Sequence, residues 1–170
     1  MTHSHADIAC AMAHGDLPAP TGDRRLVAVF ASPVALQLVH LAAHCGWSCV
    51  VLDPAGRELD GVRTATTAAD AGLDGSTDVV VTDHDRPELG DVLADVLQHD
   101  TRWVGVMGSP RHTAPHVAAL VERGLADADV ARVHRPIGLD VGSRSPVEIA
   151  VATVAGLLAD RNGRAGGTYG

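Results

Sequence analysis

Continuous apolar runs alternate with helical patterns through most of this chain, and this alternation limits the fold more than any other feature. Four runs have the character of buried strands: Leu26–Phe30, Ser48–Leu52, "DVVVTD" from Asp78 and "RWVGVMG" from Arg102. Such runs, without polar residues at every second position, are typical of strands in a sheet that is covered on both faces. The segments between them repeat apolar residues with the 3.6-residue period of a helix, most clearly over residues 147–158. The alternation predicts βαβ units and an α/β domain with a mostly parallel sheet.

The chain has 170 residues, which fits one domain with a real core. We expect an N-terminal extension over residues 1–23, where Ala6–Ala13 can form a short helix and "HGDLPAPTGD" is a linker. The folded domain is expected over residues 24–162. The Gly-rich end, residues 163–170, is expected to be a flexible tail.

Charge and composition exclude several classes of function. The net charge is −8, and all thirteen basic residues are Arg, so the chain has no Lys. An acidic protein is poorly suited to neutralising nucleic-acid phosphates, and without Lys there is no Schiff-base chemistry and no P-loop Lys. No apolar run is long enough for a membrane span, and the first residues do not resemble a secretory signal. The three cysteines, with no C-x-x-C pair, fit a reduced compartment, so we expect a cytoplasmic protein.

The loop after the first predicted strand lacks the glycines of a dinucleotide-binding loop. It reads Ala31-Ser32-Pro33, which adds Cβ atoms where a pyrophosphate would approach and removes one backbone N–H at the helix start. Asp53 ends the second strand 22 residues after Ala31, the position from which an acidic residue binds the ribose of a dinucleotide. An ordinary Asp-Pro turn at the end of a strand explains Asp53 equally well, and the sequence leaves both interpretations open.

A Ser-Pro pair occurs in three of the expected strand-end loops: Ser32-Pro33, Ser109-Pro110 and Ser145-Pro146. Each pair predicts a helix that begins with a Ser N-cap and a Pro in its first turn. Glu148 completes a capping box in the third loop. The pairs can simply start helices, but helix N-termini gathered at one edge of a sheet also suit an anionic ligand.

Ligands of open α/β sheets bind outside the carboxyl ends of the strands, so the candidate residues come from these loops. "MGSPRH" offers a glycine, a hydroxyl and basic groups, and "PIGLDVGSR" offers two glycines, a carboxylate and a guanidinium. The triplet Asp83-His84-Asp85 could bind a metal or relay a proton, or it could be a capped helix start with a solvated His. The predicted ligand-binding residues are Ser32, Asp53, Asp83, His84, Gly108, Ser109, Arg111, His112, Gly138, Asp140, Gly142 and Arg144.

No metal site is predicted, and no residue is assigned a catalytic role. His40, His44, Cys45 and Cys49 have the composition of a zinc ligand set, but Cys45 belongs to the apolar stripe of its helix and Cys49 to a buried strand. His112 and His116 are four residues apart without the Glu of H-E-x-x-H, so zinc hydrolase chemistry is not expected.

Several segments together resemble a known family. "GWSCVVLDP", "VVVTDHD" and "RWVGVMGSPRH", with the run "RPIGLDVGSRSPVEIA", are similar to the Rossmann-type domain of the XdhC/CoxI family over about residues 25–162. The resemblance implies a Rossmann-like, three-layer α/β/α fold. Where the family commonly has G-A-G-H after the first strand, this chain has Ala31-Ser32-Pro33.

The same resemblance implies an accessory role for xanthine or carbon monoxide dehydrogenase. Such a protein acts as a chaperone that binds, protects or delivers the molybdenum cofactor, a phosphorylated pterin, to a molybdenum hydroxylase client, and it can form a homodimer. Two alternatives remain at this stage. One is an NAD(P)-dependent oxidoreductase, which the altered loop disfavours, and the other is a degenerate domain that serves only dimerisation or regulation.

Overall fold

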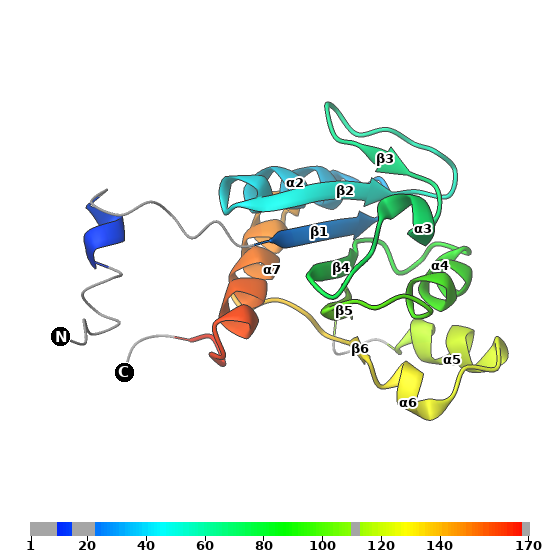
Figure 1. Ribbon diagram of the computed structural model, residues 1–170. Coiled ribbons are helices and arrows are strands. Elements are labelled where there is room, and N and C mark those ends of the chain that lie inside the picture. The colour runs from blue at the N-terminus through cyan, green and yellow to red at the C-terminus, as the bar shows by residue number, and fades with distance from the viewer. Residues whose placement is uncertain (1–9, 15–22, 110–112, 168–170) are drawn as a thin grey trace.

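A six-stranded, all-parallel sheet forms the centre of the molecule (Figure 1). The computed structural model describes residues 10–14, 23–109 and 113–167. The strand order is β3-β2-β1-β4-β5-β6, so the order reverses between β1 and β4. The strands are β1 (Arg24–Val29), β2 (Trp47–Leu52), β3 (Thr64–Ala65), β4 (Thr77–Val81), β5 (Trp103–Val106) and β6 (Val133–His134). The predicted parallel α/β sheet is confirmed.

Helices cover both faces of the sheet, as the continuous apolar strands require (Figure 1). Along β1, Val27 and Val29 belong to one buried cluster, whereas Leu26 and Ala28 belong to the other, because successive side chains point to opposite faces. One face carries α2 (Pro33–His44) and α7 (Pro146–Arg161), and the other carries α3 (Ala68–Ala71), α4 (Leu89–Val96), α5 (Pro115–Glu122) and α6 (Asp127–Val130). The fold is therefore the expected three-layer, Rossmann-like sandwich.

Two of the three predicted Ser-Pro helix starts are confirmed. Ser32 caps α2, and Ser145 caps α7 in a full capping box with Glu148. The third prediction is wrong, because α5 begins at Pro115 with Ala114 as its N-cap. A helix that began at residue 110 would hold Pro115 in its interior, where proline lacks an N–H and clashes with the carbonyl four residues earlier.

A buried carboxylate joins α7 to the amino-terminal edge of the sheet. Asp78 of β4 is fully buried and accepts hydrogen bonds from Trp47 Nε1 (3.0 Å), Arg161 Nε (2.7 Å) and Arg102 Nε. The Arg161 guanidinium also lies over the Trp47 ring. Arg161 is the last residue of α7, so this cluster holds the carboxyl end of the helix at the amino-terminal edge of the sheet. The amino end of α7 lies at the carboxyl edge of the sheet.

The two ends of the chain are described in part. Residues 10–13 are helical, in agreement with the end of the helix expected at Ala6–Ala13, and the rest of that helix lies outside the described residues. The same holds for residues 15–22 of the expected linker. In the part of the chain that the structure describes, no helix combines the length and apolar character needed to span a bilayer.

Candidate functional site at the carboxyl edge of the sheet

Phe30 opens the turn after β1, immediately before Ala31-Ser32-Pro33. Its φ is +71°, a left-handed conformation that glycine adopts readily and other residues adopt at a cost. The side chain is fully buried, and the Arg86 guanidinium lies 5.2 Å from the centre of its ring. The turn therefore has a left-handed backbone residue whose aromatic side chain is buried in the hydrophobic core.

Asp53 holds this turn closed from the end of β2. Its carboxylate is fully buried and accepts hydrogen bonds from the backbone N–H groups of Ala31 and Ala55, both at 2.9 Å. Arg57 Nε lies 3.4 Å from the same oxygen that Ala31 contacts. Both carboxylate oxygens are thus engaged within the protein, as expected of a strand-ending turn. Contact between Asp53 and a ribose stays a prediction.

Ser32 is also engaged within the protein. Its Oγ accepts a hydrogen bond from the N–H of Ala35 (3.0 Å) and lies 2.9 Å from Oγ1 of Thr82. Thr82 follows β4 and has its hydroxyl 2.9 Å from the carbonyl oxygen of Val29. These contacts tie the start of α2 to the end of β4 across the point where the strand order reverses, so the usual phosphate position is internally bonded.

The Asp83-His84-Asp85 triplet forms a local turn. Asp83 Oδ1 accepts a hydrogen bond from the N–H of Asp85 (3.1 Å), and His84 Nε2 lies 3.6 Å from Asp85 Oδ1. In the following residues the Arg86 guanidinium binds Glu88 and lowers the pKa of that carboxyl group. No group of three or more His, Cys, Asp or Glu side chains that could hold a metal ion occurs among residues 10–14, 23–109 and 113–167.

The "PIGLDVGSR" segment packs against α7. A Cβ on Gly138 would lie 3.1 Å from the backbone carbon of Ala152, and a Cβ on Gly156 would lie 2.9 Å from the Cα of Gly138. Leu139 donates its N–H to the carbonyl of Ala152 (3.0 Å), so the crossing is held by a hydrogen bond as well. Gly138 therefore has a clear packing role, because its missing side chain allows the segment to touch the helix.

The end of this segment forms the capping box of α7. Glu148 accepts hydrogen bonds from the N–H groups of Arg144 (2.6 Å) and Ser145 (3.1 Å), and these bonds lower the pKa of its carboxyl group. The predicted ligand residues Asp140, Gly142 and Arg144 are exposed in this loop. Contact between these residues and a ligand stays a prediction.

The loop after β5 is anchored by Arg135. The Arg135 guanidinium covers Gly108, at the place where a Cβ would stand, and donates to the carbonyls of Thr113 (3.0 Å) and Ser109 (3.3 Å). These two carbonyls lie on either side of residues 110–112, so Arg135 holds both ends of the loop. The predicted ligand residues Arg111 and His112 lie outside the described residues.

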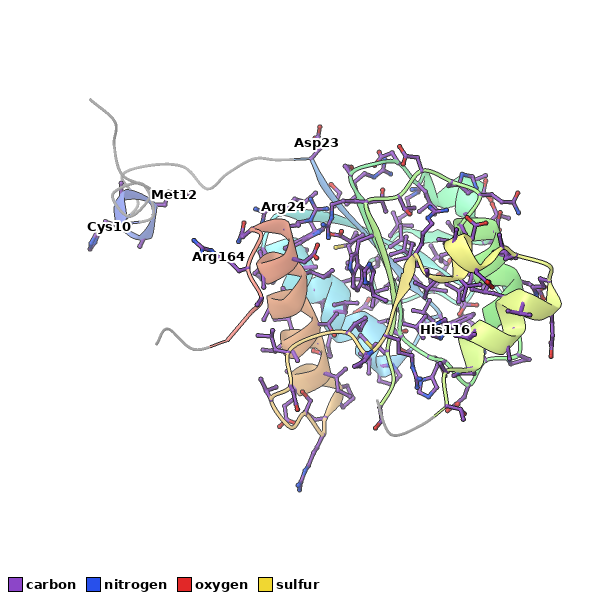
Figure 2. All side chains as sticks on the ribbon, turned by 90° about the horizontal axis from the view of Figure 1, so that it is seen from below. Cys10, Met12, Asp23, Arg24, His116 and Arg164 are labelled. Carbon is purple, nitrogen blue, oxygen red and sulfur yellow. The ribbon has the colours of Figure 1, made fainter. Side chains whose placement is uncertain are left out.

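His116 lies beside this anchor, in the first turn of α5. Its side chain is only 4% exposed, and its Nδ1 has no hydrogen-bond partner among the described residues. Burial lowers the pKa of its imidazole, and the positive charge of Arg135 lowers the pKa further. Figure 2 shows His116 at the end of the molecule opposite Asp23 and Arg24, which mark the start of β1. His116 therefore belongs to the carboxyl edge of the sheet.

Comparison with known proteins agrees with this architecture. A family model described as the XdhC Rossmann domain matches residues 26–157, which run from β1 almost to the end of α7. The chain belongs to the XdhC family. This XdhC-family chain is similar to the uncharacterized protein YqeB of Escherichia coli (strain K12), with 31% identity over 77 residues, 45% of this chain and 14% of YqeB.

A solved structure has the same fold. It is described as a xanthine dehydrogenase from Bacillus halodurans, and it superposes with a TM-score of 0.65 at 24% identity. The match covers 84% of this chain and 44% of the other. The XdhC-family chain thus spans less than half the length of either protein.

In the described part of the XdhC-family chain, five of the predicted residues lie in contacts within the protein, whereas Asp83 and His84 form a local turn and Asp140, Gly142 and Arg144 are exposed. Ser32 and Asp53 lie in the closed turn at β1, Gly108 and Ser109 lie under Arg135, and Gly138 lies against α7. Arg135 and His116 are not among the predicted ligand residues. One weak signal for His116 is present in the sequence: it precedes Leu120 by one helical turn, so it is a polar residue on a buried face.

Proposed function

We propose that this chain is an accessory protein of a molybdenum hydroxylase of the xanthine or carbon monoxide dehydrogenase type, and that it binds the molybdenum cofactor for its client. Membership of the XdhC family supports the accessory role. The cofactor is a phosphorylated pterin, so its binding site needs donors for an anionic group. The proposed place for that group is the loop after β5 and the start of α5.

The contrast between two loops at one sheet edge supports this location. At β1, the carboxylate of Asp53 already accepts hydrogen bonds from the N–H groups of Ala31 and Ala55, and the Oγ of Ser32 accepts the N–H of Ala35. At β5, the Arg135 guanidinium supplies a positive charge that its two carbonyl contacts hold in place. Ordered positive charge near a helix start favours an anion. The residues present fit the phosphate of the cofactor at β5 better than a dinucleotide at β1.

A binding screen tests the proposal. Molybdenum cofactor released anaerobically from a purified molybdenum hydroxylase is titrated into the chain, and binding is followed by the fluorescence of Trp47 and Trp103 and by melting temperature. We expect saturable binding of the cofactor and no response to millimolar NADH or NADPH. Binding of NAD(P)H without binding of the cofactor would instead establish the oxidoreductase alternative.

Exposed valines favour a second candidate function, that of an interaction module. Val147 and Val151 are one turn apart on α7 and are each about half exposed, and Val141 in the preceding loop is 62% exposed. Adjacent exposed apolar side chains of this kind suit contact with a client or a second copy of the chain. Replacing Val147 and Val151 by Asp should abolish a dimer detected by light scattering, or the capture of the client, while cofactor binding is retained.

A further inference from the structure

In the described part of the chain, no side chain caps the first turn of α5, and the N–H of Val117 is bonded to the carbonyl of Ala114 (3.1 Å). The helix has eight residues, its N-cap is Ala114, and no described side chain caps it. Pro115 occupies the first helical position and brings no N–H of its own. By comparison, the N-termini of α2 and α7 are capped by Ser32 and Ser145, whereas α4 and α6 begin without a side-chain cap, as α5 does. A helix N-terminus without a cap has N–H groups and a dipole that favour negative charge.

His116 adds an independent observation at the same place. Its side chain is more than nine-tenths buried, and Nδ1 has no partner among residues 10–14, 23–109 and 113–167. Figure 2 shows the ring beside the first turn of α5. Buried polar atoms in folded proteins are almost always bonded, and an unbonded one calls for a missing ligand or water.

The neighbouring charge decides which kind of ligand suits this atom. Arg135 is close enough to lower the pKa of His116, and its guanidinium is held by the carbonyls of Ser109 and Thr113. A fixed positive charge repels a cation, and no cluster of metal-ligating side chains surrounds His116 among the described residues. A neutral imidazole can carry its single proton on Nδ1 and donate it. The surroundings therefore suit an oxyanion.

We propose that the first turn of α5 is an oxyanion subsite in which His116 Nδ1–H donates to an oxygen of a phosphate monoester, with Arg135 supplying the fixed charge. The identity of the ligand as the phosphate of the pterin cofactor rests on the proposed function. The subsite itself rests on His116, Arg135 and the uncapped helix start. It is therefore testable with inorganic phosphate alone.

Three substitutions separate the role of Nδ1 from a general role of the side chain. His116→Asn keeps a donor near the Nδ1 position, His116→Gln keeps one near the Nε2 position, and His116→Phe keeps only the ring volume. Phosphate binding is measured by calorimetry, and the imidazole nitrogen shifts of His116 are followed by ¹⁵N NMR, with chloride at equal ionic strength as the control. We expect phosphate to shift Nδ1, and we expect about tenfold weaker binding in the Gln and Phe variants but not in the Asn variant.

Stability without ligand gives a second readout that does not depend on binding. Because Nδ1 has no partner in the described part of the chain, His116→Phe should unfold at the same or higher urea concentration than the parent in phosphate-free buffer. Phosphate should raise the midpoint of the parent more than that of His116→Phe, because it binds the parent more tightly. Equal phosphate affinity in the parent and in His116→Phe, or no change at Nδ1 on adding phosphate, would overturn the subsite.

The outcomes for the two proposals are distinguishable. If phosphate binds through His116 but the molybdenum cofactor does not bind, the subsite stands and the proposed function fails. If the cofactor binds the parent and His116→Phe equally well, the proposed function stands and the subsite fails.

Discussion

Replacing Phe30 by glycine and by alanine tests how the turn after β1 is built. The side chain is fully buried, so its removal should cost about 3–5 kcal/mol in the free energy of unfolding. The left-handed backbone at φ +71° costs a residue with a Cβ about 1–2 kcal/mol, which glycine avoids and alanine does not. Glycine loses roughly 0.5–1 kcal/mol more chain entropy on folding. Phe30→Gly should therefore be about 0.5–1 kcal/mol more stable than Phe30→Ala.

The neighbouring residue provides a matched control. Val29 is equally buried and is the last residue of β1, in regular strand conformation. At that position the usual order applies, and Val29→Ala should be more stable than Val29→Gly. The free energy of unfolding of the four variants is obtained from urea titrations followed by the fluorescence of Trp47 and Trp103, with circular dichroism as a second probe.

The relative stability of Phe30→Gly and Phe30→Ala shows whether residue 30 has a left-handed or a regular strand backbone. If Phe30→Gly is less stable than Phe30→Ala, as expected at Val29, the left-handed turn is not a property of the folded protein. Phe30→Gly also tests the closed loop, because the bond from the N–H of Ala31 to Asp53 does not involve the side chain at position 30. We expect this variant to remain without affinity for NADH in calorimetry.

The packing leads to three further predictions. Asp78→Ala leaves two arginines without their buried carboxylate and should lower the free energy of unfolding by about 3–5 kcal/mol in urea titration, against a much smaller loss for the exposed Asp140→Ala. Gly138→Ala adds a Cβ at φ +83° against the backbone of α7 and should cost roughly 1–3 kcal/mol by the same measurement, whereas Gly142→Ala, also left-handed but with open space, should cost less. Burial raises the pKa of Cys49 to about 11, so at pH 8 a thiol reagent should label the exposed Cys45 promptly and the partly buried Cys49 much more slowly; equally fast labelling of the two would contradict this.

The strands and the long helices could be predicted because their signals are local. The apolar runs at β1, β2, β4 and β5 require two covered faces, and the 3.6-residue period of α7 requires one buried stripe. The four-residue helices α3 and α6 are not predicted, because each is about one turn long and shows no period. The sequence pattern places the start of α5 five residues early. Both Pro110, which follows Ser109, and Pro115 can occupy the first position of a helix, and the structure has Pro115 there.

For the candidate site, the sequence could predict the location at the carboxyl edge of the sheet but not the contacts of its residues. Ser32, Asp53 and Gly108 do lie at the carboxyl ends of their strands, as the topology requires. Their partners could not be read from the sequence, because the contacts join distant segments: Ala31 with Asp53, Ser32 with Thr82, and Arg135 with Ser109. Whether a polar residue at a strand end faces a ligand or satisfies a neighbouring loop depends on these long-range contacts.

The closed turn at β1 and the uncapped helix start at α5 have a common physical origin. A Rossmann-like fold brings several strand ends and helix starts to one edge, and every uncapped N–H there needs an acceptor. At β1 the protein supplies that acceptor itself: Asp53 binds Ala31, and Ser32 binds the first turn of α2. At α5 no described side chain supplies one and the N–H of Val117 is bonded to the carbonyl of Ala114, while within the described residues a buried nitrogen of His116 stays unbonded beside Arg135. An anionic ligand would complete the hydrogen bonding at α5, whereas at β1 it would have to displace bonds that are already made.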